Sequence, residues 1–159
     1  MVRAGTIALF LLLVTGCSIG SNPEPPASEV LRVEQISAGA PGQGSERPRV
    51  IVAPSARALS TTIGENIPDS GKGAYLAAYW GQKPTGGYSL GVQSARLEGD
   101  RVTVRIALEE PPRDAVVTQV LTYPYAVAVV RDLDPKGKRF SFTDQGGREL
   151  GWPVRIAGG

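Results

Sequence analysis

The sequence has no histidine, a single cysteine and little net charge, and each scarcity excludes a class of function. Without histidine, the chain lacks the commonest general base and the usual zinc ligand. One cysteine, Cys17, allows no disulfide within the chain. The formal net charge is only +2, and the basic residues are scattered, which argues against a nucleic-acid-binding surface. We therefore expect no metal, no cofactor and no nucleic-acid partner.

The first residues have the pattern of a bacterial export signal. The stretch MVR at 1–3 gives a basic start, and it precedes an apolar run at 7–14 that is too short to span a bilayer as a helix. The stretch VTGC at 14–17 resembles the lipobox of bacterial lipoproteins. This resemblance implies cleavage of a signal peptide at 1–16, diacylation of the Cys17 thiol (a palmitate-type anchor) and usually acylation of the new amino group. A plain secretory peptide with an incidental cysteine is the alternative.

The segment that follows predicts a tether and then one folded domain. Residues 17–29 contain SIGSNPEPPASE, which is rich in Pro, Ser and Gly and is typical of a flexible linker. The remaining residues, 30–159, form one β-rich domain of ordinary apolar content. We expect a lipid-anchored protein of the bacterial cell envelope, on the outer membrane or on the outer face of the cell membrane.

Alternating apolar and polar residues predict β-strands through most of this domain. The clearest case is RVTVRIALE at 101–109, and LEGD at 97–100 has the Gly and Asp of a tight turn. Residues 88–109 therefore predict an antiparallel hairpin. The apolar face of its second strand carries Val102, Val104, Ile106 and Leu108.

Two runs are apolar on both faces, which predicts central strands at 74–80 and 123–130. Further strand candidates lie at 30–36, 50–53, 140–142 and 150–156, with DQGG turning the chain between the last two.

One segment has helical spacing instead. Pro54 stands at a helix start, Ala56, Leu59 and Ile63 repeat at helical intervals, and Gly64 follows as a stop. The predicted fold is mostly β, an antiparallel β sandwich or barrel with one short helix.

Motifs that would carry catalysis or metal binding are incomplete. NIPDSGKG at 66–73 lacks the first glycine and the hydroxyl residue of a phosphate-binding loop. DLDPKG at 132–137 places Lys136 at a calcium-ligand position, so it predicts a β-turn. Nucleophilic catalysis needs a base beside a hydroxyl group, and Lys83 with Thr85 is the one such pair worth naming. A lysine this close to a threonine in sequence is common by chance. The sequence predicts no catalytic residues and a protein that is not an enzyme.

A longer stretch carries a family resemblance. GAYLAAYWGQKPTGGYSLGVQSARLEGDRVTVRIALEEPP and VTQVLTYPYAVAVV, within residues 74–130, closely resemble the C-terminal domain of PrcB, an accessory subunit of a bacterial surface protease complex. The matching features are Gly81, the loop at 84–88, the hairpin that follows, the proline pair at 111–112 and the segment 118–124. The resemblance implies a lipid-anchored protein that helps a protease partner assemble, persist or be regulated.

The loop at 83–88 alone also resembles the NPTTGY loop of chagasin-type cysteine-protease inhibitors, which are immunoglobulin-like sandwiches. Lys83 and Gly86 depart from that pattern, and Trp152-Pro153 is a candidate for a second inhibitory loop. An inhibitor is therefore an alternative function. A structural envelope lipoprotein without a protease partner is another.

The loop has two interpretations. It could be a recognition edge, since Pro84 fixes φ, the glycines permit positive φ and close approach of a partner, and Tyr88 offers an aromatic anchor. It could equally turn the chain between two strands while Tyr88 packs into the core. Tyr123 and Tyr125 pose the same choice between an aromatic contact and core packing. The candidate partner-binding residues are Pro84, Thr85, Gly86, Gly87 and Tyr88.

Overall fold

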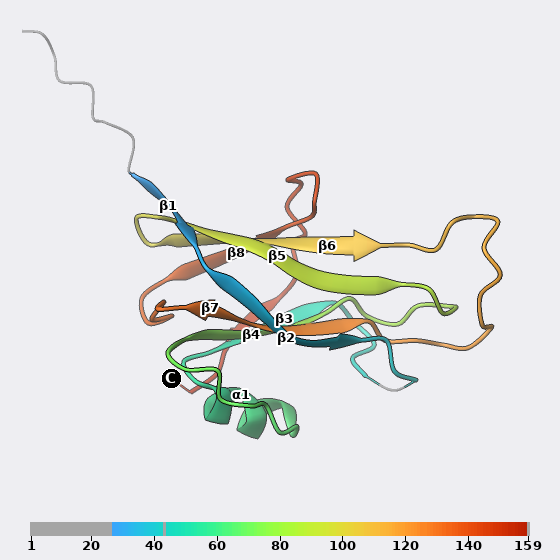
Figure 1. The fold of residues 1–159 in the computed structure, drawn as a ribbon, viewed down its shortest axis with the longest axis horizontal. Coiled ribbons are helices and arrows are strands. Elements are labelled where there is room, and N and C mark those ends of the chain that lie inside the picture. The colour runs from blue at the N-terminus through green and yellow to red at the C-terminus, as the bar shows by residue number, and fades with distance from the viewer. Residues whose placement is uncertain (1–26, 43, 159) are drawn as a thin grey trace, which may run out of the picture.

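A computed structural model describes residues 27–42 and 44–158 and shows two β-sheets packed face to face, with one helix (Figure 1). One sheet has the strand order β1-β5-β6-β8 and the other the order β2-β7-β4-β3-β9. The predicted fold class is confirmed as a sandwich; within the described residues the sheets do not close into a barrel. The elements are β1 (Ser28–Leu31), β2 (Val33–Gly39), β3 (Arg49–Ala53), α1 (Ala56–Ile63), β4 (Gly73–Tyr79), β5 (Ser89–Glu98), β6 (Arg101–Glu109), β7 (Tyr125–Arg131), β8 (Arg139–Thr143) and β9 (Val154–Ile156).

The predicted hairpin is present as β5 and β6. Glu98 pairs with Arg101, so Gly99 and Asp100 form the connecting turn, and Gly99 has a φ of 62°. Because successive side chains of a strand point to opposite faces, the alternating valines and Ile106 of β6 all enter the core between the sheets.

The two strands predicted to be central, β4 and β7, pair with each other in the middle of the five-stranded sheet. One face of this pair packs against the four-stranded sheet. The other face carries Tyr75 and Val129 into a second cluster, which also contains Leu59 of α1. Burial on both faces explains why these runs are apolar throughout.

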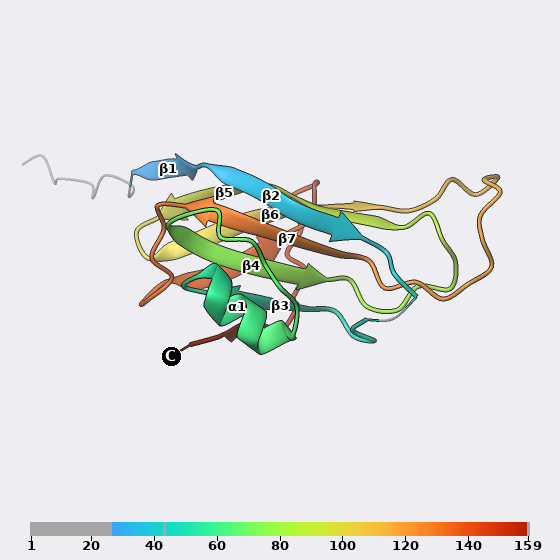
Figure 2. The same ribbon diagram turned by 60° about the horizontal axis from the view of Figure 1, so that its bottom comes forward.

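The predicted helix is present as α1, which lies against the five-stranded sheet (Figure 2). Ser55 is its N-cap: its side-chain oxygen accepts a hydrogen bond from the Ala58 N–H at 3.2 Å. The extended backbone of Ser55 places the helix start at Ala56, two residues after Pro54. Gly64 ends the helix with a left-handed φ of 78°, as its position predicts.

The last two strands differ from the sequence expectation. The chain turns after β8 as predicted, since Gly147 N–H donates to the Asp144 carbonyl at 3.0 Å. Only Glu149 and Leu150 return beside β8, and the chain then crosses to the other sheet. There β9 pairs in parallel with β3, while β8 pairs in parallel with β6. Both sheets are therefore mixed, and the strand expected at 150–156 shortens to β9.

The run predicted at 30–36 divides into two strands at Arg32, with β1 in one sheet and β2 in the other. β1 begins at Ser28, two residues before the expected domain start. Cys17, the signal peptide predicted at 1–16 and most of the predicted tether lie outside the described residues. In the part of the chain that the structure describes, no helix has the length and apolar character needed to cross a membrane.

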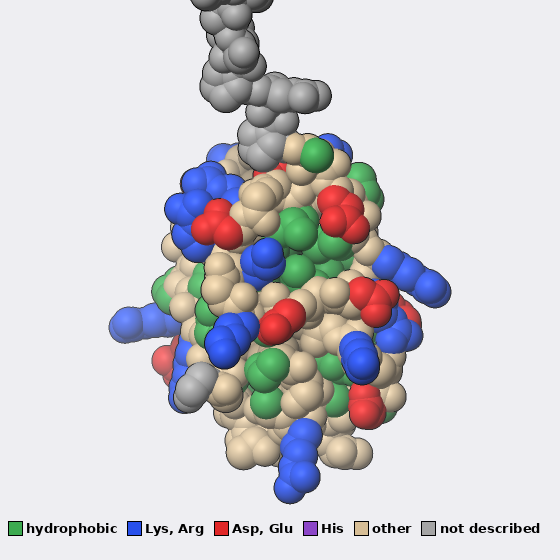
Figure 3. All heavy atoms as spheres, turned by 90° about the vertical axis from the view of Figure 1, so that its left-hand side faces the viewer, with side chains coloured by type: hydrophobic (Ala, Val, Ile, Leu, Met, Phe, Trp, Pro, Cys, Tyr) green, Lys and Arg blue, Asp and Glu red, His purple; other side chains and the backbone are tan. Residues whose placement is uncertain are grey.

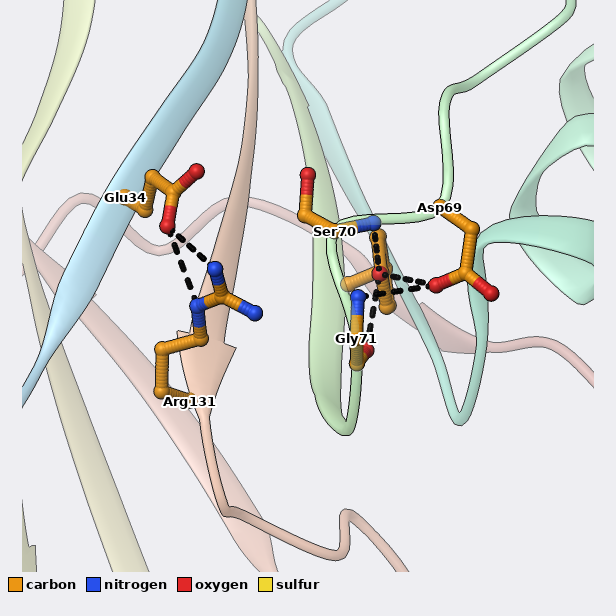
Figure 4. Close-up of polar contacts among 6 residues, drawn as sticks. Glu34, Asp69, Ser70, Gly71 and Arg131 are labelled. Carbon is orange, nitrogen blue, oxygen red and sulfur yellow. Dashed lines mark hydrogen bonds and ion pairs between the residues drawn. The ribbon is translucent and has the colours of Figure 1, made fainter.

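Asp69, Ser70 and Gly71 form a polar cluster (Figure 4) around the hydroxyl of Tyr75, whose side chain is buried in the cluster that includes Leu59 of α1. The Tyr75 hydroxyl accepts a hydrogen bond from the Ser70 N–H at 2.8 Å and lies 2.9 Å from the Gly71 carbonyl and 3.1 Å from Asp69 Oδ1. Beside this cluster, Glu34 of β2 and Arg131 of β7 form an ion pair at 2.6 Å that joins the two strands (Figure 4).

We expect Tyr75→Phe to lower the free energy of unfolding by about 1–2 kcal/mol at neutral pH, because it leaves the Ser70 N–H without its acceptor. Burial raises the pKa of Tyr75, so the native state holds this proton after the unfolded chain has lost it. Its contribution to stability is therefore complete below pH 10 and declines as the pH rises further. Urea unfolding from pH 7 to pH 11 should show a shallower alkaline decline in Tyr75→Phe than in the parent.

Tyr79→Phe is the matched control. Burial also raises the pKa of Tyr79, but its hydroxyl forms no hydrogen bond within the described residues. This variant should keep the neutral-pH stability of the parent and flatten the alkaline decline as well. An equal loss at neutral pH in both variants would contradict the role assigned to the Tyr75 hydroxyl.

Candidate protein-contact site

Three loops meet at one end of the sandwich, on the right in Figure 1, and we call this region the loop end. They connect β2 to β3 (residues 40–48), β4 to β5 (80–88) and β6 to β7 (110–124). Backbone hydrogen bonds join them: Gln82 N–H donates to the Glu46 carbonyl at 3.1 Å, and Tyr123 N–H donates to the Pro41 carbonyl at 3.0 Å.

The 80–88 and 110–124 loops hold each other in a short ladder. Lys83 and Thr122 exchange two backbone hydrogen bonds of 2.8 and 3.0 Å, and Gly86 N–H donates to the Thr118 carbonyl at 2.9 Å. The buried Thr122 hydroxyl adds a bond of 2.7 Å to the Thr85 carbonyl. Each loop therefore braces the other.

Both glycines of the predicted recognition loop lie close to residues 111–118 of the same chain; Gly86 is buried, whereas Gly87 is exposed to solvent. A Cβ on Gly86 would collide with the Thr118 hydroxyl, and a Cβ on Gly87 would lie 2.8 Å from Pro111 Cβ and 3.2 Å from Val117 Cγ1. Gly87 also has a φ of 87°, whereas Gly86 is not among the glycines with positive φ. The glycines do permit close approach to their backbone, but the segment that approaches is residues 111–118 of the same chain.

Tyr88 is half-buried against the core between the sheets, and its ring meets the Trp80 ring edge-on at 5.6 Å. Lys83 extends over both rings, with Nζ at 4.0 Å from the Trp80 centroid and 5.5 Å from the Tyr88 centroid. Burial lowers the pKa of Lys83, against the opposing effect of Glu110. The aromatic ring of Tyr88 thus packs between the core and the Lys83 side chain of the loop.

The remaining candidates of this loop have separate positions. Pro84 is exposed at the turn, and Thr85 is half-buried with its hydroxyl donating to the Gly86 carbonyl at 3.1 Å. The Thr85 hydroxyl therefore bonds to the neighbouring backbone and not to Lys83.

The 110–124 loop presents apolar side chains to solvent, and it extends beyond the 80–88 loop (Figure 1). Val116 is fully exposed, at 103% of its reference area, and Val120 and Leu121 are about half exposed. Sequence reasoning missed these residues because it followed glycine, proline and tyrosine signals. The available signal was AVVTQVL, an apolar-rich stretch that neither alternates like a strand nor carries helix caps.

Other side chains singled out from the sequence do not join the exposed apolar side chains of this loop. The Tyr123 hydroxyl donates to Gln82 Oε1 at 3.2 Å, whereas Tyr125 stacks on Tyr79 at 6.4 Å. They do not form one aromatic patch. Trp152 is partly buried against the core, and the Pro153 carbonyl accepts the Val50 N–H at 2.9 Å. The Trp152-Pro153 segment therefore crosses between the sheets and adds no second loop at this end.

The segment 132–137 turns as predicted: Asp134 Oδ1 accepts the Lys136 N–H at 2.9 Å, and Lys138 N–H donates to the Pro135 carbonyl at 3.1 Å. Among the described residues, no group of three or more His, Cys, Asp or Glu side chains is placed to hold a metal ion. The end opposite the loop end shows acidic and basic side chains interspersed around small hydrophobic areas (Figure 3).

Comparison with known protein families gives one match. Residues 74–131 match the family model described as PrcB C-terminal, which confirms the resemblance predicted for residues 74–130. The match begins in β4 and ends in β7, so it contains the 80–88 and 110–124 loops. Neither the curated proteins nor the solved structures include one that matches the chain.

Proposed function

We propose that this protein is a non-catalytic subunit that binds a protease through its loop end, because residues 74–131 match the family model described as PrcB C-terminal, an accessory-subunit family. The observation that carries the proposal is the exposed apolar surface of Val116, Val120 and Leu121. These residues lie inside the family-matched segment. Apolar side chains grouped on a projecting loop mark protein contacts.

The structure around these residues favours binding. Full burial of an aliphatic side chain contributes about 1.5–3 kcal/mol, so a few such residues supply a useful binding energy. The ladder between Lys83 and Thr122 already orders the loop, which reduces the entropy lost when a partner docks. Gly86, Gly87 and Tyr88 then act as the support of the contact surface rather than as its anchors.

The inhibitor alternative is less well supported by this geometry. It requires the 83–88 loop to enter a protease cleft, yet Gly86 is buried and residues 111–118 lie against the Cβ positions of both Gly86 and Gly87. The 110–124 loop, which reaches further, has no counterpart in the inhibitor resemblance. We therefore favour an accessory subunit.

We propose also that a lipid on Cys17 anchors the protein to a membrane of the cell envelope. The described chain begins near Ser28, at the end opposite the loop end (Figure 1). At about 3 Å per residue, the chain between Cys17 and Ser28 would span roughly 30 Å. Anchoring there leaves the loop end free to face away from the membrane, toward a partner at the surface.

Crosslinked capture of the full lipoprotein from native membranes, with mass spectrometry, tests both statements. The parent should enrich a protease, and Val116→Asp combined with Val120→Asp should lose it, because the two carboxylates oppose desolvation at the contact. Unfolding should change by no more than about 0.5 kcal/mol, since both side chains are exposed. The matched control is Val30→Asp, an exposed valine in β1 at the opposite end, which should retain the protease.

The other outcomes separate the alternatives. Equal recovery of the protease by parent and loop variant would keep the partnership and move its surface elsewhere. Absence of a protease from every capture would favour a structural envelope lipoprotein. In the same membranes, Cys17→Ser should move the protein to the soluble fraction; retention in the membrane would reject the lipid anchor.

A further inference from the structure

The edge strand β9 carries a second surface, away from the loop end, that the proposed function does not use. Within the described residues, β9 has one neighbour, β3, which it pairs in parallel. The Pro153 carbonyl accepts the Val50 N–H at 2.9 Å, and Ala157 N–H donates to the Val52 carbonyl at 2.7 Å. Since alternate residues of a strand bond to opposite sides, the N–H and C=O groups of Val154 and Ile156 point outward from the sheet.

The apolar side chains of β9 are only partly covered. Val154 and Ile156 stand opposite Val50 and Val52 and share their face of the sheet, toward the interior of the sandwich. Val50 and Val52 are completely buried, but Val154 is 39% exposed and Ile156 is 49% exposed. Val154 and Ile156 stay partly exposed because the five-stranded sheet faces a sheet of only four strands, which ends at β8.

A mainly apolar cavity of about 540 Å³, lined also by Asp134 and Lys136, continues this uncovered strip. Ile156 and Ala157 form part of its wall, together with Pro54 and Pro135 from the loops on either side. The free edge therefore offers outward backbone groups and an adjacent recess for an apolar side chain. Those two features together fit an extended polypeptide better than a helix or a small ligand.

Charge distinguishes a foreign strand from a second copy of this chain. Arg155 lies between the two apolar residues on the opposite face of β9, is exposed, and forms no ion pair within the described residues. In the antiparallel self-pairing that uses the outward groups of both Val154 and Ile156, Arg155 would stand directly opposite its own copy. Like charges in that position are destabilising. A partner strand with a carboxylate there is favoured.

We propose that β9 is a docking edge for an extended segment of a partner protein with an apolar–acidic–apolar pattern. The segment adds a strand beside β9, its apolar side chains cover Val154 and Ile156, and its carboxylate lies opposite Arg155. This docking does not rest on the proposed protease contact, because it involves other residues at another edge of the molecule.

The test uses two synthetic nine-residue peptides, one alternating valine with glutamate and the other alternating valine with lysine. Amide exchange and chemical shifts of the full protein are followed by NMR during titration. The Val–Glu peptide should slow exchange of the Val154 and Ile156 amides and bind roughly fivefold more tightly than the Val–Lys peptide. Arg155→Glu should reverse this preference. Arg113→Glu, an equally exposed change at the loop end, should leave it unaltered.

Three results would overturn the proposal. The preference for the glutamate peptide could survive Arg155→Glu, which would remove the role of the charge. The Val154 and Ile156 amides could already exchange slowly in the free protein at low concentration, which would mean that another part of the chain covers the edge. Protection that grows with protein concentration alone, without peptide, would identify a second copy as the occupant.

Discussion

Replacing Ile106 by alanine is expected to lower the free energy of unfolding by about 2–5 kcal/mol. Ile106 has no exposed surface, lies in β6 opposite Val92, and packs in the core between the two sheets. Truncation removes buried methyl groups and leaves a cavity that strands on both sides prevent from closing. Urea unfolding of the purified protein measures the loss as a lower midpoint at unchanged slope.

The control is the neighbouring residue, Arg105, whose side chain is on the solvent face of the same strand. Arg105→Ala should change the free energy of unfolding by no more than about 0.5 kcal/mol. The contrast between adjacent positions tests the alternation of β6 directly. Comparable losses in the two variants would mean that this strand does not have one buried face.

The features predicted well from the sequence depend on short stretches of chain. The β5–β6 hairpin follows from the alternation around Ile106 and from LEGD, whose Gly99 adopts the positive φ that the turn requires. The helix α1 follows from apolar spacing and from Gly64, which adopts the left-handed conformation of a helix end. In each case residues close in sequence fix the local structure.

The features that were missed depend on contacts between distant residues. The pairing of β9 with β3 joins Val154 to Val50 across most of the domain, and nothing in the alternation of residues 150–156 indicates which sheet they enter. The division of the first strand run at Arg32 has the same origin, since it is set by the crossing of the chain from one sheet to the other. Parallel pairing therefore could not be predicted.

The candidate site shows the same limit. The loop at 83–88 was recognised from its glycines, and the family match supports that segment. Its role could not be assigned, because the segment that packs against Gly86 and Gly87 is a loop some thirty residues later in the chain. Val116, which is exposed, belongs to that same later loop.

Gly87→Ala should lower the free energy of unfolding by about 2–5 kcal/mol. A left-handed backbone costs a residue with a Cβ about 1–2 kcal/mol, and Gly87 has a φ of 87°. The new methyl group would also press on Pro111 Cβ, 2.8 Å away, and on Val117, and such overpacking costs about 1–3 kcal/mol. Urea unfolding measures the total, and NMR shifts of residues 111–118 would report displacement of the second loop.

Gly99→Ala separates the two contributions. Gly99 also has a positive φ, 62°, but its added Cβ would meet no atom within 4 Å, so only the backbone cost of about 1–2 kcal/mol applies. If Gly87→Ala loses more unfolding free energy than Gly99→Ala, then Gly87 is required for packing between the two loops of this chain. Equal losses, with the 111–118 signals unmoved, would show that Gly87 is free of residues 111–118. The 83–88 loop would then regain its place as a recognition edge, because Gly87 would be open to a partner.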